Sequence, residues 1–134
     1  MAEARIIDGK AFAAGLCRRI ARQVNVLKRN HGIIPGLAAV LVGADEASRI
    51  YVRNKERACN EAGIFTETFR LSRDVSEDEV CSLVEKLNRD NRIHGILVQL
   101  PLPRGRDEHR VLELVEPGKD ADGLHPTNLG WLVL

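Results

Sequence analysis

The chain has 134 residues, of which 44% are hydrophobic and 29% are charged, and its formal net charge is +1. This length predicts one domain with a core of its own, and the composition excludes disorder, collagen and a coiled-coil array for the chain as a whole. A charge near neutral argues against nucleic acid as the main partner, and no apolar run approaches the about 18 residues that a membrane-spanning helix needs.

The first predicted element is a helix from Asp8, a residue type that caps helices well, to about Asn30. Gly32 suits the position after the end of this helix. The apolar run Leu37–Val42 stops at Gly43 and predicts a buried strand. In the helix predicted after Asp8, apolar residues recur at every third or fourth position, at Phe12, Leu16, Ile20, Val24 and Leu27.

A second helix is predicted from Asp45 to about Ala62, where Gly63 stops it. An imperfect alternation over Phe65–Leu71 predicts a strand. Ser76 and Glu79 have the spacing of a capping box and predict a third helix. The apolar residues of that third helix are Val80, Leu83, Val84 and Leu87.

The strongest strand signal is Gly95–Leu100, which Pro101 ends, and a fourth helix is predicted over about Asp107–Val115. Helices and strands therefore alternate, which requires crossover connections. This order predicts an α/β fold, a three-layer sandwich with a mostly parallel sheet and helices on both faces. Ligands of such sheets bind beyond the carboxyl ends of the strands, which directs attention to Gly43 onward, to residues 99–103 and to residues 119–128.

Cysteines, histidines and glycines carry few further signals. Cys17, Cys59 and Cys81 form no C-x-x-C pair, which predicts reduced, buried thiols in a compartment like the cytosol, and the start of the chain has no apolar segment of a secretory signal. The four histidines share no spacing with other ligands, so we expect no metal site. Neither G-x-G-x-x-G nor G-x-x-x-x-G-K-[ST] occurs, so we expect no dinucleotide or phosphate loop in this chain.

Several polar residues are placed where chemistry is expected. Ser48, Tyr51 and Lys55 share one face of the second helix, and an amine that loses its proton near neutral pH can act as a general base. Gln99, at the end of a strand, can orient such a lysine. A carboxylate in the loop Lys119–Pro126 can hold the N–H donors of a heterocycle. A simpler interpretation of each group, as solvated surface, remains open from the spacing alone.

Three runs of sequence carry a resemblance to a known family. They resemble, in order and spacing, the catalytic domain of the bifunctional folate enzymes 5,10-methylenetetrahydrofolate dehydrogenase/5,10-methenyltetrahydrofolate cyclohydrolase, over nearly the whole chain. Ala121 and Leu124 are departures, since the family more often has Val and Phe there, and both changes are apolar for apolar. The runs are Val42–Gly43 with Ala47–Lys55 (ASRIYVRNK), Gly95–Pro103 (GILVQLPLP) and Pro117–Asn128 (PGKDADGLHPTN).

The resemblance implies that residues 1–134 form the tetrahydrofolate-binding catalytic domain and that the family's NADP-binding Rossmann domain is missing from this chain. The whole enzyme would oxidise 5,10-methylenetetrahydrofolate to 5,10-methenyltetrahydrofolate with NADP and hydrolyse the product to 10-formyltetrahydrofolate, in one-carbon metabolism that serves purine biosynthesis. A homodimer in the cytoplasm is implied, with neither nucleic acid nor a membrane as partner. The isolated chain is expected to lack dehydrogenase activity, because nothing in it would orient NADP.

The resemblance also assigns roles to single residues. Lys55 would be the general base or proton relay that activates water against the methenyl carbon, Gln99 would hydrogen-bond Lys55 and tune its proton affinity, and Tyr51 would stack against the folate. Asp122 would grip the pterin ring. The resemblance implies no residue of this chain that binds the NADP cofactor, and no metal ligand. The other residues that would line the folate site are Ser48 and, through their backbone, Leu100 and Pro101.

Two other functions remain open. One is a module that binds folate or packs on a partner without turnover, and the other is an unrelated α/β enzyme with a tyrosine–lysine pair. Hydrolysis of methenyltetrahydrofolate separates the catalytic from the non-catalytic interpretation. Residues Trp131–Leu134 are apolar, and we expect them to be exposed and to favour association.

Overall fold

The computed structural model describes residues 6–43 and 46–134, so Asp45, the predicted start of the second helix, lies outside the described residues. Every other predicted helix and strand is present, although β3 ends at Val98 rather than Leu100. A 3-10 turn and a last helix were not predicted. The elements are α1 (Gly9–His31), β1 (Gly36–Val42), α2 (Glu46–Ala62), β2 (Phe65–Leu71), α3 (Glu77–Arg89), β3 (Gly95–Val98), α4 (Glu108–Glu113), η1 (Pro117–Lys119) and α5 (Pro126–Val133).

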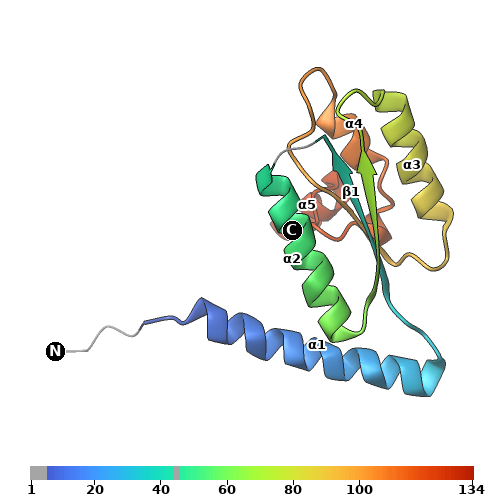
Figure 1. Ribbon diagram of the computed structural model, residues 1–134. Helices are drawn as coiled ribbons and strands as arrows, with labels where there is room; N and C mark the ends of the chain where they lie inside the picture. The colour runs from blue at the N-terminus through green and yellow to red at the C-terminus, as the bar shows by residue number, and fades with distance from the viewer. Residues whose placement is uncertain (1–5, 44–45) are drawn as a thin grey trace.

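The sheet has three parallel strands in the order β2-β1-β3, so β1 is central (Figure 1). Gly36 of β1 pairs with Phe65 of β2, and Leu37 pairs with Gly95 of β3. Each pair of parallel strands needs a crossover, which α2 and α3 provide. The predicted α/β fold with a parallel sheet is therefore confirmed.

The side chains of β1 alternate between two cores, as the pleat of a strand requires. Ala38, Val40 and Val42 belong to a cluster with residues of α3 and α4, including Val84 and Val111. Ala39 and Leu41 pack on the other face against Val52 of α2 and Leu97 of β3. Helices therefore cover both faces, with α2 on one side of β1 and α3 on the other (Figure 1), which makes the predicted three layers.

Helix α1 begins and ends as predicted. The Asp8 side chain accepts a hydrogen bond from Ala11 N at 2.9 Å, and Gly32 ends the helix with φ of 66°. The helix contacts α2 and extends beyond the sandwich (Figure 1), so of its apolar stripe only Val24 is buried. Although α1 has 23 residues, neither it nor another helix within residues 6–43 and 46–134 is long and apolar enough to cross a bilayer.

Exposure at the surface corrects one prediction and confirms another. The cysteines are free, but Cys17 is exposed on α1 and only Cys81 is buried, so the prediction of three buried thiols is wrong. The reason is that the part of α1 that carries Cys17 extends beyond the core, although the apolar spacing of α1 predicts a buried face. Residues Trp131–Leu134 are exposed, as predicted, because α5 lays no apolar face on the sandwich.

Candidate functional site

The candidate site lies where β1 and β3 end. Gly43 follows β1 with a φ of 86°, in the left-handed region that glycine tolerates, and a Cβ placed on it would meet the Pro103 side chain at 3.4 Å. The segment after β3 therefore closes over the end of β1. Between them lies a hollow of about 370 Å³ whose lining residues include Val42, Gly43 and Pro101. Two of the three predicted segments thus meet at the carboxyl edge of the sheet.

Helix α2 brings its predicted face to this part of the sheet. Val52 is fully buried against Ala39, Leu41 and Leu97, which fixes how the helix is rotated. Ser48, one turn earlier, is also buried, with 5% of its surface exposed. Lys55 is half-buried, whereas Tyr51 is 62% exposed. On the face predicted from spacing, Ser48 is therefore buried, Lys55 is partly buried and the Tyr51 side chain is exposed to solvent.

Gln99 continues the sheet beyond β3, since its backbone N–H donates to Val40 O at 2.9 Å. Its side-chain Nε2 donates to Leu100 O at 2.9 Å, and its Oε1 is buried with no hydrogen-bond partner among the residues that the structure describes. A buried acceptor without a donor costs about 1–3 kcal/mol. Gln99 Oε1 therefore has unused capacity to accept a hydrogen bond.

The hydrogen bond expected between Gln99 and Lys55 is not formed in this structure. Lys55 makes no hydrogen bond or ion pair with any described residue. The Cα–Cβ bonds of a helix tilt toward its N-terminus, and the N-terminus of α2 lies at the edge where Gln99 follows β3. Both groups thus have unused hydrogen-bonding capacity, Lys55 as a donor and Gln99 as an acceptor.

The segment from Leu100 to Leu102 forms one wall of the hollow. The peptide bond between Leu100 and Pro101 is cis, Pro101 is exposed, and Leu102 is buried in the core. Leu102 N donates to the Glu108 carboxylate at 2.7 Å, which ties this wall to α4. Pro101 lacks an N–H group, so its exposed surface is an apolar contact for a flat ligand.

The third predicted segment, residues 119–128, approaches the sheet at β3. Asp120 forms a parallel bridge with Ile96, and Ala121 N donates to Ile96 O at 3.2 Å. Asp122 is exposed and forms no hydrogen bond or ion pair within residues 6–43 and 46–134. Asp122 therefore offers a carboxylate with no partner among the described residues, and no contact in the structure joins it to Lys55 or Gln99.

Sequence reasoning missed Asp120. This carboxylate is partly buried and accepts hydrogen bonds from Gly123 N, His125 N and Asn128 Nδ2. The available signal was an aspartate followed by a glycine three residues later, a pattern typical of a tight turn.

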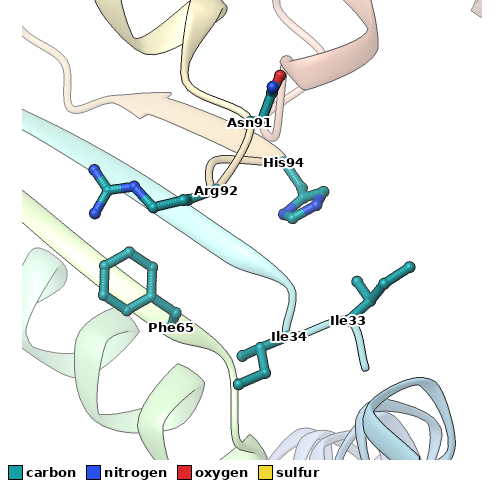
Figure 2. Close-up of a pocket in the computed structure, with 6 residues that line it drawn as sticks. All are labelled: Ile33, Ile34, Phe65, Asn91, Arg92 and His94. Atoms are coloured by element: carbon teal, nitrogen blue, oxygen red, sulfur yellow. The ribbon is translucent and has the colours of Figure 1, made fainter. Parts of the chain in front are cut away.

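A second hollow lies at the opposite edge of the sheet. It measures about 420 Å³ and is lined by Ile33, Ile34, Phe65, Asn91, Arg92 and His94 (Figure 2). His94 Nδ1 accepts a hydrogen bond from Gly36 N at 3.1 Å, so this imidazole is engaged by the start of β1. None of the predicted site residues lines this hollow, and it lies at the amino ends of the strands, away from the edge where such sheets bind ligands.

Metal ligands do not gather in the described part of the chain, where no group of three or more His, Cys, Asp or Glu side chains could hold an ion. The predicted site residues offer an amine, a phenol, an amide and a carboxylate, from Lys55, Tyr51, Gln99 and Asp122. These groups can bind a polar heterocycle and move a proton.

Comparison with known proteins identifies the family of this chain. The family model for the tetrahydrofolate dehydrogenase/cyclohydrolase catalytic domain matches residues 7–122. The bifunctional protein FolD of Magnetococcus marinus is 54% identical over 130 residues, which cover 97% of this chain and 46% of that protein. The chain therefore spans about half the length of the curated relatives that it matches.

Solved structures show the same relation. The bifunctional FolD of Campylobacter jejuni has a TM-score of 0.91 and 41% identity, over 93% of this chain and 44% of that one. A Trypanosoma brucei FolD, solved with NADP cofactor and inhibitor, has a TM-score of 0.93 and 36% identity, over 98% of this chain and 45% of that one. The chain therefore belongs to the tetrahydrofolate dehydrogenase/cyclohydrolase family, whose catalytic domain its residues 7–122 match.

Proposed function

We propose that the protein containing this chain oxidises 5,10-methylenetetrahydrofolate to 5,10-methenyltetrahydrofolate with NADP and hydrolyses the product to 10-formyltetrahydrofolate. In this proposal the chain is the substrate-binding, catalytic half. The observation that carries it is the buried Oε1 of Gln99 at the end of the sheet, which has no hydrogen-bond partner among the described residues. The half-buried Lys55 of α2, also without a partner there, supports it as the group that Gln99 would orient. The family membership supplies the identity of the substrate.

The folate is proposed to lie between α2 and the wall formed by Leu100 and Pro101. Tyr51 is exposed enough for its ring to stack on the aromatic part of the ligand, and Ser48 lies on the same face of α2. Asp122, which has no partner of its own, accepts hydrogen bonds from the N–H groups of the pterin.

Lys55 is proposed to carry the proton during hydrolysis. As the oxygen of a water molecule bonds to the methenyl carbon, the Lys55 amine takes one proton of that water and later releases it to solvent. The second proton passes to the ring nitrogen whose bond to the same carbon breaks, which leaves 10-formyltetrahydrofolate. Gln99 orients the Lys55 amine through Oε1 once the site is occupied.

NADP would accept the hydride in the dehydrogenase step. The sequence has no glycine-rich phosphate loop, and the chain covers 46% of the FolD of Magnetococcus marinus. We therefore propose that NADP is held mainly by a Rossmann domain in the part of the protein that the relatives have and this chain does not span. In that step, this chain would hold the folate so that its methylene carbon is in position to transfer the hydride.

The assembly and location of the protein are also part of the proposal. The resemblance implies a homodimer in the cytoplasm, without nucleic acid or a membrane as partner. The three free cysteines agree with a reducing compartment.

The proposed function predicts that the chain binds tetrahydrofolate derivatives and that the protein containing it hydrolyses 5,10-methenyltetrahydrofolate. Binding of 5-formyltetrahydrofolate, a stable folate, is measured by calorimetry, and hydrolysis is measured as loss of the near-ultraviolet absorbance of the methenyl compound. Binding together with hydrolysis supports the proposal. Binding without hydrolysis identifies a folate-binding module instead, and absence of binding refutes both functions.

A further inference from the structure

The loop that carries Asp122 is anchored at its start by Lys119. The Lys119 ammonium donates to three backbone carbonyls at the end of α3, those of Leu87 at 3.2 Å, Asn88 at 2.7 Å and Asp90 at 3.0 Å. The last carbonyls of a helix lack partners within the helix and favour a cation. Lys119 therefore fixes the start of the loop to a rigid element.

The end of the same loop is anchored by His125 and Asn128. His125 Nδ1 accepts from Thr127 N at 3.1 Å, which leaves the ring N–H on Nε2 to donate to Glu113 O at 3.2 Å. Asn128 Nδ2 donates to Pro117 O at 3.0 Å and so joins the end of the loop to its beginning. Both ends of the loop are thus fixed, and the turn lies between them.

Asp120 holds this turn from within. Its Oδ1 accepts from Gly123 N at 3.1 Å, and its Oδ2 accepts from His125 N at 2.8 Å and from Asn128 Nδ2 at 2.9 Å. Desolvation raises the pKa of Asp120, but hydrogen bonds from Asn128 and from the loop backbone outweigh it and hold this pKa below its ordinary value. The carboxylate is therefore ionised at neutral pH and can accept from several donors at once.

Asp122 sits at the apex of the turn that Asp120 closes. Gly123, the next residue, has a φ of 69°, in the left-handed region that favours glycine, and its N–H is one of those that Asp120 holds. Asp122 itself is exposed and has no partner among the described residues. Nothing on the Asp122 side chain therefore sets its direction, which follows from the backbone on either side.

We propose that Asp120 is a positioning residue, which fixes the turn at residues 121–124 so that Asp122 presents its carboxylate to the substrate. This inference rests on the proposed role of Asp122 in binding the pterin. Asp120 does not touch the substrate. It reduces the freedom that Asp122 would otherwise lose on binding, which strengthens binding by preorganisation.

Asp120→Asn is the sharpest single change, because it keeps the size of the side chain and removes one acceptor. The amide NH2 group must then face either Gly123 N or the donors on His125 and Asn128, and two donors repel each other. The turn is expected to loosen without a cavity. Ser76→Ala is the matched control for lost stability. Ser76 and Glu79 cap the N-terminus of α3, whereas Lys119 binds at its C-terminus, so Ser76 does not touch the loop.

The test is a double-mutant cycle on binding of 5-formyltetrahydrofolate, measured by calorimetry. Asp120→Asn is expected to raise the Kd by about 5- to 10-fold in the wild-type background and by less than about 2-fold in an Asp122→Ala background, because a residue that acts through another loses its effect when the other is removed. Ser76→Ala should leave the Kd unchanged while lowering the urea midpoint. Equal effects of Asp120→Asn in both backgrounds would overturn the proposal and leave Asp120 a structural residue.

Amide hydrogen exchange separates this proposal from the proposed function. The N–H groups of Gly123 and His125 are expected to be protected in the wild type and to exchange at least about 10-fold faster in Asp120→Asn. Unchanged protection would refute the claim that Asp120 fixes the turn, whatever the binding data show. If the wild type binds no folate, the proposed function fails, and the exchange rates alone decide whether Asp120 fixes the turn.

Discussion

Replacing Lys55 with methionine is expected to lower the rate of 5,10-methenyltetrahydrofolate hydrolysis by about a hundred- to ten-thousand-fold, the range typical for loss of a general base. Methionine keeps most of the apolar stem that a half-buried lysine packs against its surroundings, but it cannot accept a proton. The rate is measured in single-turnover experiments as loss of near-ultraviolet absorbance, in the protein that contains this chain. Lys86→Met, on the exposed face of α3, is the control.

A second variant separates proton transfer from positive charge. Lys55→Arg keeps the charge, but a guanidinium does not release its proton near neutral pH, so this variant is also expected to hydrolyse the substrate slowly. Folate binding should change little in either variant. Wild-type turnover by Lys55→Met would contradict the role assigned to Lys55, and near wild-type turnover by Lys55→Arg would show that the charge alone is needed.

Asp122→Ala is expected to raise the Kd for 5-formyltetrahydrofolate by about 10- to 100-fold. The reason is that hydrogen bonds to a charged group contribute about 1.5–3 kcal/mol, and each 1.4 kcal/mol corresponds to about a tenfold change in Kd. Asp122 has no partner within the described residues, so its loss removes no contact that the fold needs. The urea midpoint should therefore stay at the wild-type value.

The measurement is calorimetric titration of the chain with 5-formyltetrahydrofolate. Glu113→Ala is the matched control, because Glu113 is likewise an exposed acidic side chain near the loop, on α4. An equal Kd for wild type and Asp122→Ala would remove Asp122 from the binding site. Equal losses in both variants would point to general electrostatic attraction in place of a specific contact.

Local signals predicted most of the fold. Asp8 and Ser76 cap the helices that their positions indicate, and the imperfect alternation of Phe65–Leu71 is a strand because it pairs in parallel with β1. Burial was less predictable, since the apolar stripe of α1 extends past the sandwich. Helix α5 was not predicted, although His125 caps it and Pro126 stands in its first turn. None of its residues is buried, and its sequence lacks the apolar stripe that indicates a packed helix.

The sequence was enough to name candidate residues for the site, but not the contacts that those residues make. Helical spacing was enough to name Ser48, Tyr51 and Lys55 as candidates on α2, and the end of an apolar strand was enough to name Gln99. The spacing of residues along the chain does not show whether Gln99 contacts Lys55; in this structure Gln99 Nε2 donates to Leu100 O, and Gln99 Oε1 has no partner among the described residues. Asp120 was missed because it acts on backbone N–H groups that only the folded turn brings together.

The position of a bound folate tests the proposed site most directly. A crystal structure of the chain with 5-formyltetrahydrofolate is expected to show the pterin hydrogen-bonded to Asp122, the aromatic ring against Tyr51, and Gln99 Oε1 within hydrogen-bond reach of the Lys55 ammonium. A ligand in the hollow at the amino ends of the strands, beside Phe65 and His94, with the carboxyl edge empty, would contradict it.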